Sequence, residues 1–142
     1  MEFITFNEIV NKTKIESPIL FSLEHDVIPS EEDISKFEEQ YNIQLTEKYK
    51  QFLLKYGGGF FGYANLYSLD KDSSFYLLNY NDIPLTNILC VADNGCGDYY
   101  ALKIVETKCQ DAILFFEHDT GLLCDTKFSD IFEYLVSVGL KR

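Results

Sequence analysis

Apolar residues between positions 30 and 56 recur at helical spacing. Three of them follow Ser30 with the pattern i, i+3, i+7, and four follow Thr46 with the pattern i, i+3, i+4, i+7. Both hydroxyl residues can cap a helix N-terminus, and Glu31–Asp33 place negative charge where the helix dipole favours it. Gly57–Gly59 follows the second segment, and glycine is the usual residue at a left-handed helix end. The pattern predicts two helices, the first ending near Asn42 and the second at Tyr56, with these apolar stripes: Ile34, Phe37 and Tyr41, then Tyr49, Phe52, Leu53 and Tyr56.

Two further helices are expected near the ends of the chain. Thr5 and Glu8 have the spacing of a capping box, which predicts a helix over 5–13. The proline-containing stretch 16–29 has no clear period and is expected to be extended. Thr126 or Ser129 is expected to cap a last helix that stops at Gly139 and carries the stripe Phe128, Ile131, Phe132, Leu135 and Val138.

The segment 88–102 predicts the central hairpin. Ile88–Ala92 is an apolar, β-favouring run, Asp93–Asp98 holds two glycines, an Asn and two acids, and Tyr99–Leu102 resumes the apolar run. Four more strands are expected in two further hairpins, over 60–70 with 74–80 and over 112–117 with 122–125, the latter joined by a turn at 118–121. Hairpins bracketed by helices predict a single α+β domain over 1–142, an antiparallel sheet of about five to six strands with helices packed against it.

The charge narrows the classes of partner. With 23 acidic and 12 basic residues the net charge is −11, which disfavours nucleic acid, whose phosphates are held by Lys and Arg, and disfavours anionic membranes. An acidic surface suits a basic protein partner, although it also serves solubility alone. The first residues, MEFITFNEIV, lack the features of a signal peptide, and no run approaches the roughly 18 apolar residues of a membrane span. The expected compartment is the cytoplasm.

The cysteines and glycines do not assemble a recognisable cofactor or metal motif. The four cysteines include no C-x-x-C pair, and the GGGFFG run follows a helix and lacks the Lys and Ser or Thr of a phosphate-binding loop. Glycines stand where an EF-hand loop needs oxygen ligands. No cofactor or metal is therefore expected. Cys96 with His118 as base is the one candidate for a thiol enzyme, and no basic neighbour is evident to activate Cys96.

Five acids fall at strand ends or turns, where they have two interpretations. They are either solvated turn residues or the rim of a surface that contacts a basic partner, and exposed tyrosines such as Tyr99 would strengthen the second interpretation. The acids are Asp93, Asp98, Glu117, Asp119 and Asp125, and the residues we select as partner-binding are Asp93, Asp98, Tyr99, Glu117 and Asp119.

The order of these motifs resembles the SUKH superfamily, which groups fungal cell-wall-assembly regulators with many bacterial proteins. The resemblance covers about residues 29–138. It is carried by the segments Ser30–Ile34, Phe37-Glu38, Tyr41–Ile43, Tyr49, Phe52–Gly58, Asp93–Tyr99, Phe116–Asp119, Phe128 and Ile131–Leu135.

The resemblance implies an α+β fold without a catalytic centre. It also implies that the chain is a bacterial immunity protein, which blocks a cognate toxin by direct stoichiometric binding. Many such toxins are nucleases with basic surfaces, and an acidic inhibitor suits them. The alternatives are an intracellular regulatory scaffold domain, as the fungal relatives suggest, and the thiol enzyme that would use Cys96.

Overall fold

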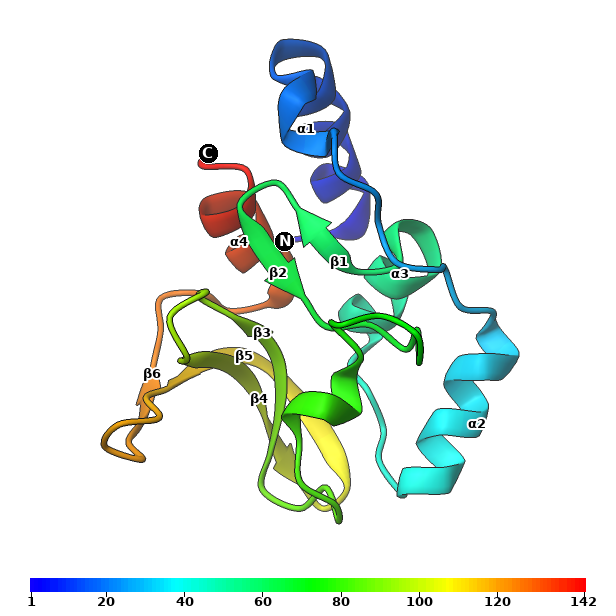
Figure 1. Cartoon of the computed structure of the whole chain (residues 1–142), viewed down its shortest axis with the longest axis vertical. Coiled ribbons are helices and arrows are strands. Elements are labelled where there is room, and N and C mark those ends of the chain that lie inside the picture. Colours follow the sequence, from blue (N-terminus) through cyan, green and yellow to red (C-terminus); the bar gives the residue numbers. More distant parts are fainter.

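One antiparallel sheet of six strands forms the frame of the protein (Figure 1). The computed structural model describes all residues, 1–142, and its strands are hydrogen-bonded in sequence order from β1 to β6. Together with the helices, this arrangement confirms the predicted α+β class. The elements in chain order are α1 (Phe3–Glu16), η1 (Pro18–Phe21), α2 (Glu31–Tyr41), α3 (Glu47–Tyr56), β1 (Gly59–Phe61), β2 (Ala64–Leu66), η2 (Leu77–Tyr80), β3 (Ile88–Asp93), β4 (Tyr99–Val105), β5 (Lys108–Phe116), β6 (Leu123–Asp125), α4 (Ile131–Tyr134) and η3 (Leu135–Gly139).

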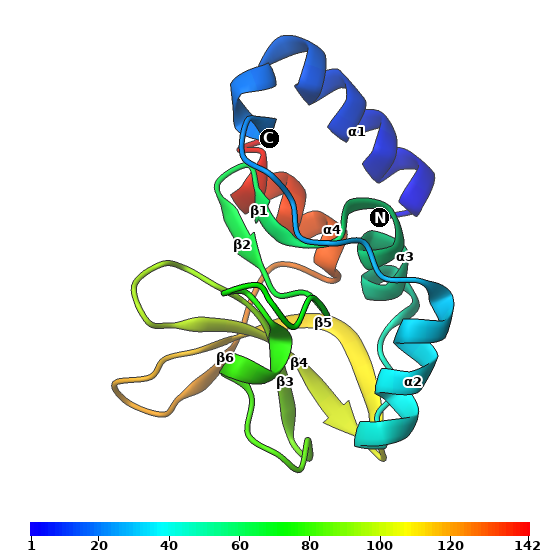
Figure 2. The same ribbon diagram turned by 45° about the vertical axis from the view of Figure 1, so that its right-hand side comes forward.

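The core is densest where α1, α3 and α4 meet β1. Rings from all four elements contact one another there, at centroid distances of 4.6 Å for Phe6–Phe132 and 5.2 Å for Phe52–Phe61. All four side chains are buried, and we call them the closed aromatic cluster. Figures 1 and 2 show these helices at one end of the molecule, while α2 runs along a side and the β3–β4 and β5–β6 loops project away from them.

The two central helices begin where the sequence predicts. The Ser30 hydroxyl accepts from the Asp33 N–H at 3.1 Å while the Asp33 carboxylate accepts from the Ser30 N–H at 2.9 Å, a complete capping box. Thr46 caps α3 by accepting from the Tyr49 N–H. Gly57, with φ +82°, ends α3, since a residue with a Cβ would be strained there. Both helix predictions are confirmed.

The capping predictions for the terminal helices are wrong. Helix α1 begins at Phe3, with Glu2 at the N-cap and no side-chain cap, and runs to Glu16. Its first turn is held by packing instead, because Phe3 stacks on Phe132 at 5.5 Å. Helix α4 is capped by Asp130, whose side chain accepts from the Glu133 N–H, and not by Thr126 or Ser129.

The region 60–80 also differs from its prediction. The expected first strand splits into the β1–β2 hairpin, and the expected second strand, 74–80, holds the short 3₁₀ helix η2 instead. The position beside β2 is taken by β3. The Asp26 carboxylate accepts from the hydroxyls of Ser68 and Ser73, at 2.6 and 2.8 Å, and so draws the intervening segment into a compact turn.

The central hairpin and the 112–125 hairpin are confirmed. Strands β4 and β5, one from each hairpin, are longer than predicted. Strand β4 reaches Val105 and β5 starts at Lys108, because Glu106 and Thr107 adopt positive φ values of 49° and 68° and close a two-residue turn. Such turns match the twist of antiparallel strands. None of the helices has the length and apolar character needed to cross a membrane.

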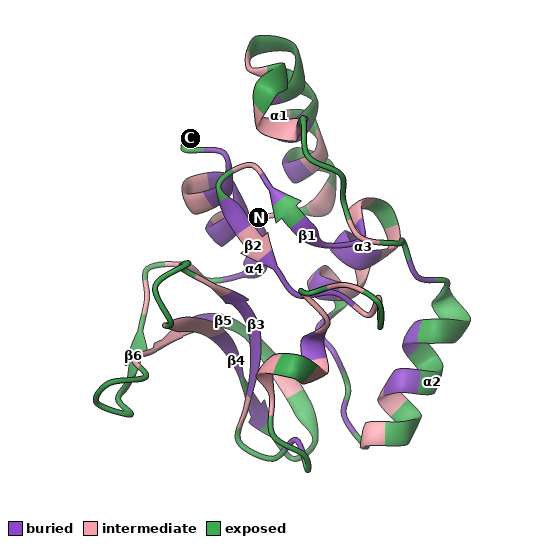
Figure 3. Cartoon of the chain, in the orientation of Figure 1, coloured by how far each residue is buried: buried purple, intermediate pink, exposed green.

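Register assigns the side chains of β3–β6 to two faces. Residues directly opposite one another in an antiparallel pair share a face, and alternate residues along a strand change face. Tyr100 and Phe115 lie on the inner face, where Tyr134 of α4 packs on Tyr100 at 4.5 Å. Tyr99 and Phe116 are opposite one another on the outer face. Figure 3 shows buried residues concentrated in the middle of the molecule, in β2, β3 and α4, and the β5–β6 loop exposed.

Candidate functional site

The β3–β4 loop and the β5–β6 loop lie side by side at one end of the sheet. Strand β4 is hydrogen-bonded to both β3 and β5, with Tyr99 opposite Asp93 on one side and opposite Phe116 on the other. The loops that leave these strand ends are therefore neighbours, and Figures 1 and 2 both show them projecting together, on the side away from α2. Asp98 from the first loop and Glu117 and Asp119 from the second come together here. This end of the sheet is the candidate site.

His118 joins the two loops. Its Nδ1 lies 2.8 Å from Asp98 Oδ1 and its Nε2 lies 2.9 Å from Asp119 Oδ1, so the ring stands between two carboxylates. The hydrogen bond to Asp98, with the charges of both acids, raises the pKa of His118 above its ordinary value, and the same hydrogen bond lowers the pKa of Asp98. Gly97 permits this contact, because a Cβ there would lie 2.9 Å from the imidazole. We call Asp98, His118 and Asp119 the loop cluster.

Asp93 holds the β3–β4 loop from within. Its Oδ1 accepts from the Gly95 N–H at 2.9 Å and from the Asn65 amide at 3.2 Å, and its Oδ2 accepts from the Tyr67 hydroxyl at 2.8 Å. Burial and the neighbouring carboxylate raise the pKa of Tyr67, so its hydroxyl stays a donor. Asp93 therefore shapes the site, and its hydrogen-bonding capacity is largely used inside the chain.

Other acids at the site are freer to meet a partner. The Glu117 carboxylate accepts one hydrogen bond, from the Thr120 hydroxyl at 3.0 Å. The Asp119 side chain is 84% exposed, and Asp125 on β6 is exposed beside the same loops. The five residues selected from the sequence thus all lie at one end of the sheet, divided between those that build the loops and those that face outward.

Sequence reasoning selected Tyr99 but missed the apolar residues beside it, Tyr80, Phe116 and Leu123. Tyr99 packs against Phe116 with the ring centroids 6.5 Å apart and against Tyr80 at 6.4 Å, and Leu123 lies opposite Phe116. We call these four side chains the open aromatic row. It consists of three aromatic rings and the leucine that ends it: Tyr80, Tyr99, Phe116 and Leu123. The apolar run 112–117 predicted a strand, but only the register and the position of α4 decide which of its faces is covered.

His118 makes its ring contacts with carboxylates and none with a cysteine. Its Nδ1 lies 2.8 Å from Asp98 and its Nε2 lies 2.9 Å from Asp119, while Cys96 is exposed. Burial raises the pKa of Cys90 to about 11 and that of Cys109 to about 12. All four thiols are unpaired. His, Cys, Asp and Glu side chains nowhere gather in a group of three that could hold a metal ion.

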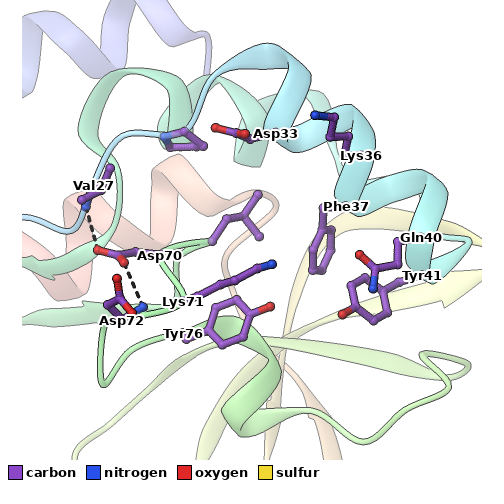
Figure 4. Close-up of a pocket in the computed structure, with 12 residues that line it drawn as sticks. Val27, Asp33, Lys36, Phe37, Gln40, Tyr41, Asp70, Lys71, Asp72 and Tyr76 are labelled. Atoms are coloured by element: carbon purple, nitrogen blue, oxygen red, sulfur yellow. Dashed lines mark hydrogen bonds between the residues drawn. The ribbon is translucent and has the colours of Figure 1, made fainter.

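A groove of about 420 Å³ opens on another side of the molecule, between α2 and the segment 69–76 (Figure 4). Phe37, Tyr41 and Tyr76 give it aromatic walls, and Lys71 extends across it toward Phe37. Asp70 accepts from the N–H groups of Val27 and Asp72, both at 3.1 Å. The groove therefore mixes both charges, and one of its acids is committed to loop structure.

Comparisons with known proteins identify the family. The model of the SMI1/KNR4 family (SUKH-1) matches residues 28–136. A crystal structure of a protein from Pseudomonas syringae pv. tomato superposes with a TM-score of 0.66 over 96% of this chain and 99% of that chain, at 18% identity, which is a likeness of fold. The search of curated proteins gives no significant match. Since the family model covers most of its length, the chain belongs to the SMI1/KNR4 family (SUKH-1).

Proposed function

We propose that this chain is a bacterial immunity protein that neutralises a basic toxin, such as a nuclease, by direct stoichiometric binding in the cytoplasm and without catalysis. The observation that carries the proposal is a group of carboxylates at one end of the sheet, in which Asp119 and Asp125 are exposed and Glu117 is half-buried, beside the half-buried Tyr99. Family membership supports it through the resemblance to bacterial immunity proteins.

The physical basis is electrostatic complementarity. A nuclease holds phosphates with Lys and Arg, and a chain of net charge −11 presents the same sign of charge as that substrate. Acids on a rim mainly accelerate association, whereas a charged pair buried in an interface mainly slows dissociation. The loop cluster fixes two loops against each other, so their acids meet a partner with little loss of conformational freedom.

The test is co-expression with the toxin encoded beside this gene, followed by binding kinetics at two salt concentrations. The variant Glu117→Gln/Asp119→Asn/Asp125→Asn removes three charges at the site and spares Asp93 and Asp98. In the loop cluster it changes only Asp119, whose contact with His118 lies within one loop, and keeps Asp98, which joins the two loops. We expect association to slow by roughly tenfold and its salt dependence to flatten, with a smaller change in dissociation.

The matched control is Glu8→Gln/Glu24→Gln/Glu39→Gln. It removes the same number of negative charges from exposed positions elsewhere and should leave association nearly unchanged. If both triple variants slow association equally, the total charge of the chain, and not the position of these acids, controls the association rate. A wild-type chain that neither binds nor protects against its neighbour's product would contradict the proposal.

The alternative function is a regulatory scaffold domain that binds another intracellular protein. The groove in Figure 4 favours this alternative, because aromatic walls flanked by both charges suit a peptide segment. Pull-down with Tyr76→Ala distinguishes the two functions. Loss of a host partner with retained toxin protection would assign the groove to the scaffold function, whereas loss of toxin protection would move the toxin interface to the groove.

A further inference from the structure

Two lines of side chains cross the outer face of the sheet at the site. The register places Asp93, Tyr99, Phe116 and Leu123 opposite one another across β3, β4, β5 and β6. The same register places a second line, Cys90, Ala101, Leu114 and Asp125, beside the first. Residues opposite one another share a face, so an acid stands at one end of each line and apolar side chains lie between them. Cys90 and Ala101 are buried, so the accessible part of the second line is Leu114 and Asp125.

Only the short 3₁₀ helix η2 covers this face of the sheet, and it covers the face only in part. On the inner face Tyr134 of α4 packs against Tyr100, but on the outer face the covering element is η2, which meets β3. Its Tyr80 ring stacks on Tyr67 at 4.0 Å and stops beside Tyr99. Beyond Tyr99 the row is half-buried, and it ends at Leu123, which is 44% exposed, next to Leu122 at 57%. Apolar side chains that converge on one open face mark an interaction surface.

We propose that the open aromatic row is the apolar centre of the partner interface, and that its occupant is a protein surface with a projecting apolar side chain surrounded by Lys and Arg. This inference rests on the proposed function and names the face and the chemistry of the partner. Acids lie close to the row: Asp98 is the loop residue directly before Tyr99, Glu117 begins the loop directly after Phe116, and Asp125 lies two residues beyond Leu123 on β6. Charge complementarity therefore selects a cationic surround.

The arrangement of charges disfavours other occupants. In a symmetric dimer the same patch meets itself, so a second copy would bring Glu117 and Asp125 against acids of the other chain. A nucleic acid would bring phosphates to the same carboxylates. Lys103 is the basic side chain that follows Ala101 on this face, two residues farther along β4 from the loops. Like charges therefore oppose both a second copy and a polyanion.

The row also has the mechanical properties of an interface centre. Tyr80 is fixed at both ends, since its ring stacks on Tyr67 and its hydroxyl donates to the Ser74 carbonyl at 2.7 Å. Tyr99 and Phe116 lie in paired strands and cannot move far. Side chains that are already ordered lose little entropy on binding, and aromatic residues dominate the energetic centres of interfaces. The acids around them contribute to association and to exclusion of the wrong partners.

The first experiment measures binding of the neighbour-encoded toxin to Tyr99→Ala and Leu123→Ala. Val105→Ala and Phe60→Ala are the controls, because Val105 and Phe60 are each 43% exposed and lie away from the row. Circular dichroism and thermal unfolding establish that each variant is folded. We expect each row variant to weaken binding by roughly thirtyfold, as at a central interface position, and each control to change it less than threefold.

The second experiment does not need the toxin. An amidated pentapeptide with a central tryptophan between two lysines and two arginines is titrated against the chain, and backbone amide shifts are recorded by NMR. Shifts should concentrate at Tyr99, Phe116 and Leu123, and they should shrink when alanine replaces the tryptophan. Shifts centred on Phe37 and Tyr76, or shifts indifferent to the tryptophan, would overturn the inference.

The outcomes separate this inference from the proposed function. If the toxin binds the wild type and the row variants bind as well as the controls, the inference fails and the proposed function stands. If the toxin does not bind the wild type, the proposed function fails and the peptide titration still decides the face. Dimerisation in sedimentation that Leu123→Ala abolishes would make a second copy the occupant and overturn the inference.

Discussion

The closed aromatic cluster and the open aromatic row are both built from large, mostly aromatic side chains, and they differ in how far the surrounding protein buries them. In the cluster, Phe6, Phe52, Phe61 and Phe132 come from four elements and are buried on all sides. In the row, Tyr99 and Phe116 come from neighbouring strands and are half-buried, with their outer side turned to solvent. The cluster brings remote parts of the chain together, whereas three of the four row residues lie on β4, β5 and β6, which follow one another in the chain and pair as neighbours.

The charged groups repeat this contrast. Asp130 is 2% exposed and accepts hydrogen bonds from the Met1 amine, at 2.6 Å, and from Lys48 Nζ, at 2.9 Å, so it ties the start of α1 and α3 to α4 beside the cluster. Burial acts to raise the pKa of Asp130, but these hydrogen bonds and that of the Glu133 N–H lower it overall. The loop cluster is solvent-exposed and connects two loops. Buried aromatics and a buried carboxylate therefore specify the fold, and their exposed counterparts are available for binding.

The largest expected effect is on the closed cluster. Phe52→Ala removes a ring that touches Phe6, Tyr56 and Phe61, and we expect it to lower the free energy of unfolding by about 3–5 kcal/mol. Urea unfolding followed by circular dichroism measures the change. Phe60→Ala, at a 43% exposed position of β1, is the control and should cost about 1 kcal/mol or less. If Phe52→Ala and Phe60→Ala lower the free energy of unfolding equally, buried rings do not stabilise the protein more than exposed ones.

The second effect concerns the buried carboxylate. Asp130→Ala removes the cap of α4 and leaves Lys48 and the Met1 amine without their partner, so we expect a loss of about 2–4 kcal/mol. Asp130→Asn keeps an acceptor for the Glu133 N–H and should lose less than Asp130→Ala. A midpoint of urea unfolding that is the same in Asp130→Ala and the wild type would show that the three-way contact does not stabilise the protein.

Local physics explains why part of the fold was predictable from the sequence. Ser30 and Thr46 cap helices through contacts within three residues, and Gly95 and Gly97 supply the positive φ of a loop that the composition already marks. Elements fixed by distant contacts were mispredicted. The segment 74–80 is not a strand. Asp26 accepts hydrogen bonds from Ser68 and Ser73, which lie more than 40 residues after it in the chain, and these contacts hold the preceding segment in a turn. The Glu106–Thr107 turn was missed because neither residue is typical of positive φ.

The acids of the site and Tyr99 were predictable from the sequence, and the rest of its apolar centre was not. Asp98, Glu117 and Asp119 stand in turns that the sequence marks, so they could be placed at loop ends before their proximity was known. Leu123 and Phe116 read as ordinary strand residues. Their exposure depends on β6 being an edge strand and on α4 lying on the opposite face, and both follow from the tertiary arrangement.

A smaller effect is expected in the open row. Tyr99→Ala leaves a half-buried site that solvent can fill, so the free energy of unfolding should fall by only about 1 kcal/mol, well below the loss for Phe52→Ala. The same urea experiment measures it. If Tyr99→Ala lowers the free energy of unfolding as much as Phe52→Ala does, Tyr99 belongs to the core. The open aromatic row would then not be a preformed binding surface.

The smallest effect, and the most specific, is the pH response of the loop cluster. The pKa of His118 is raised above its ordinary 6.5, so the stability that its pairing contributes is fully present below 6.5 and is lost as pH rises through the raised value. The pKa of Asp98 is lowered below 3.8, so its contribution is present above 3.8 and is lost as pH falls through the lowered value. The pairing is therefore strongest between about pH 4 and 6.5.

NMR titration of the His118 ring protons should give a midpoint above 6.5 that Asp98→Asn lowers. Amide exchange at Cys96 and Asp98, corrected for the intrinsic rate, should accelerate above that midpoint while exchange at Phe52 does not. A His118 midpoint that Asp98→Asn leaves in place would show that the two loops are held together without this ion pair.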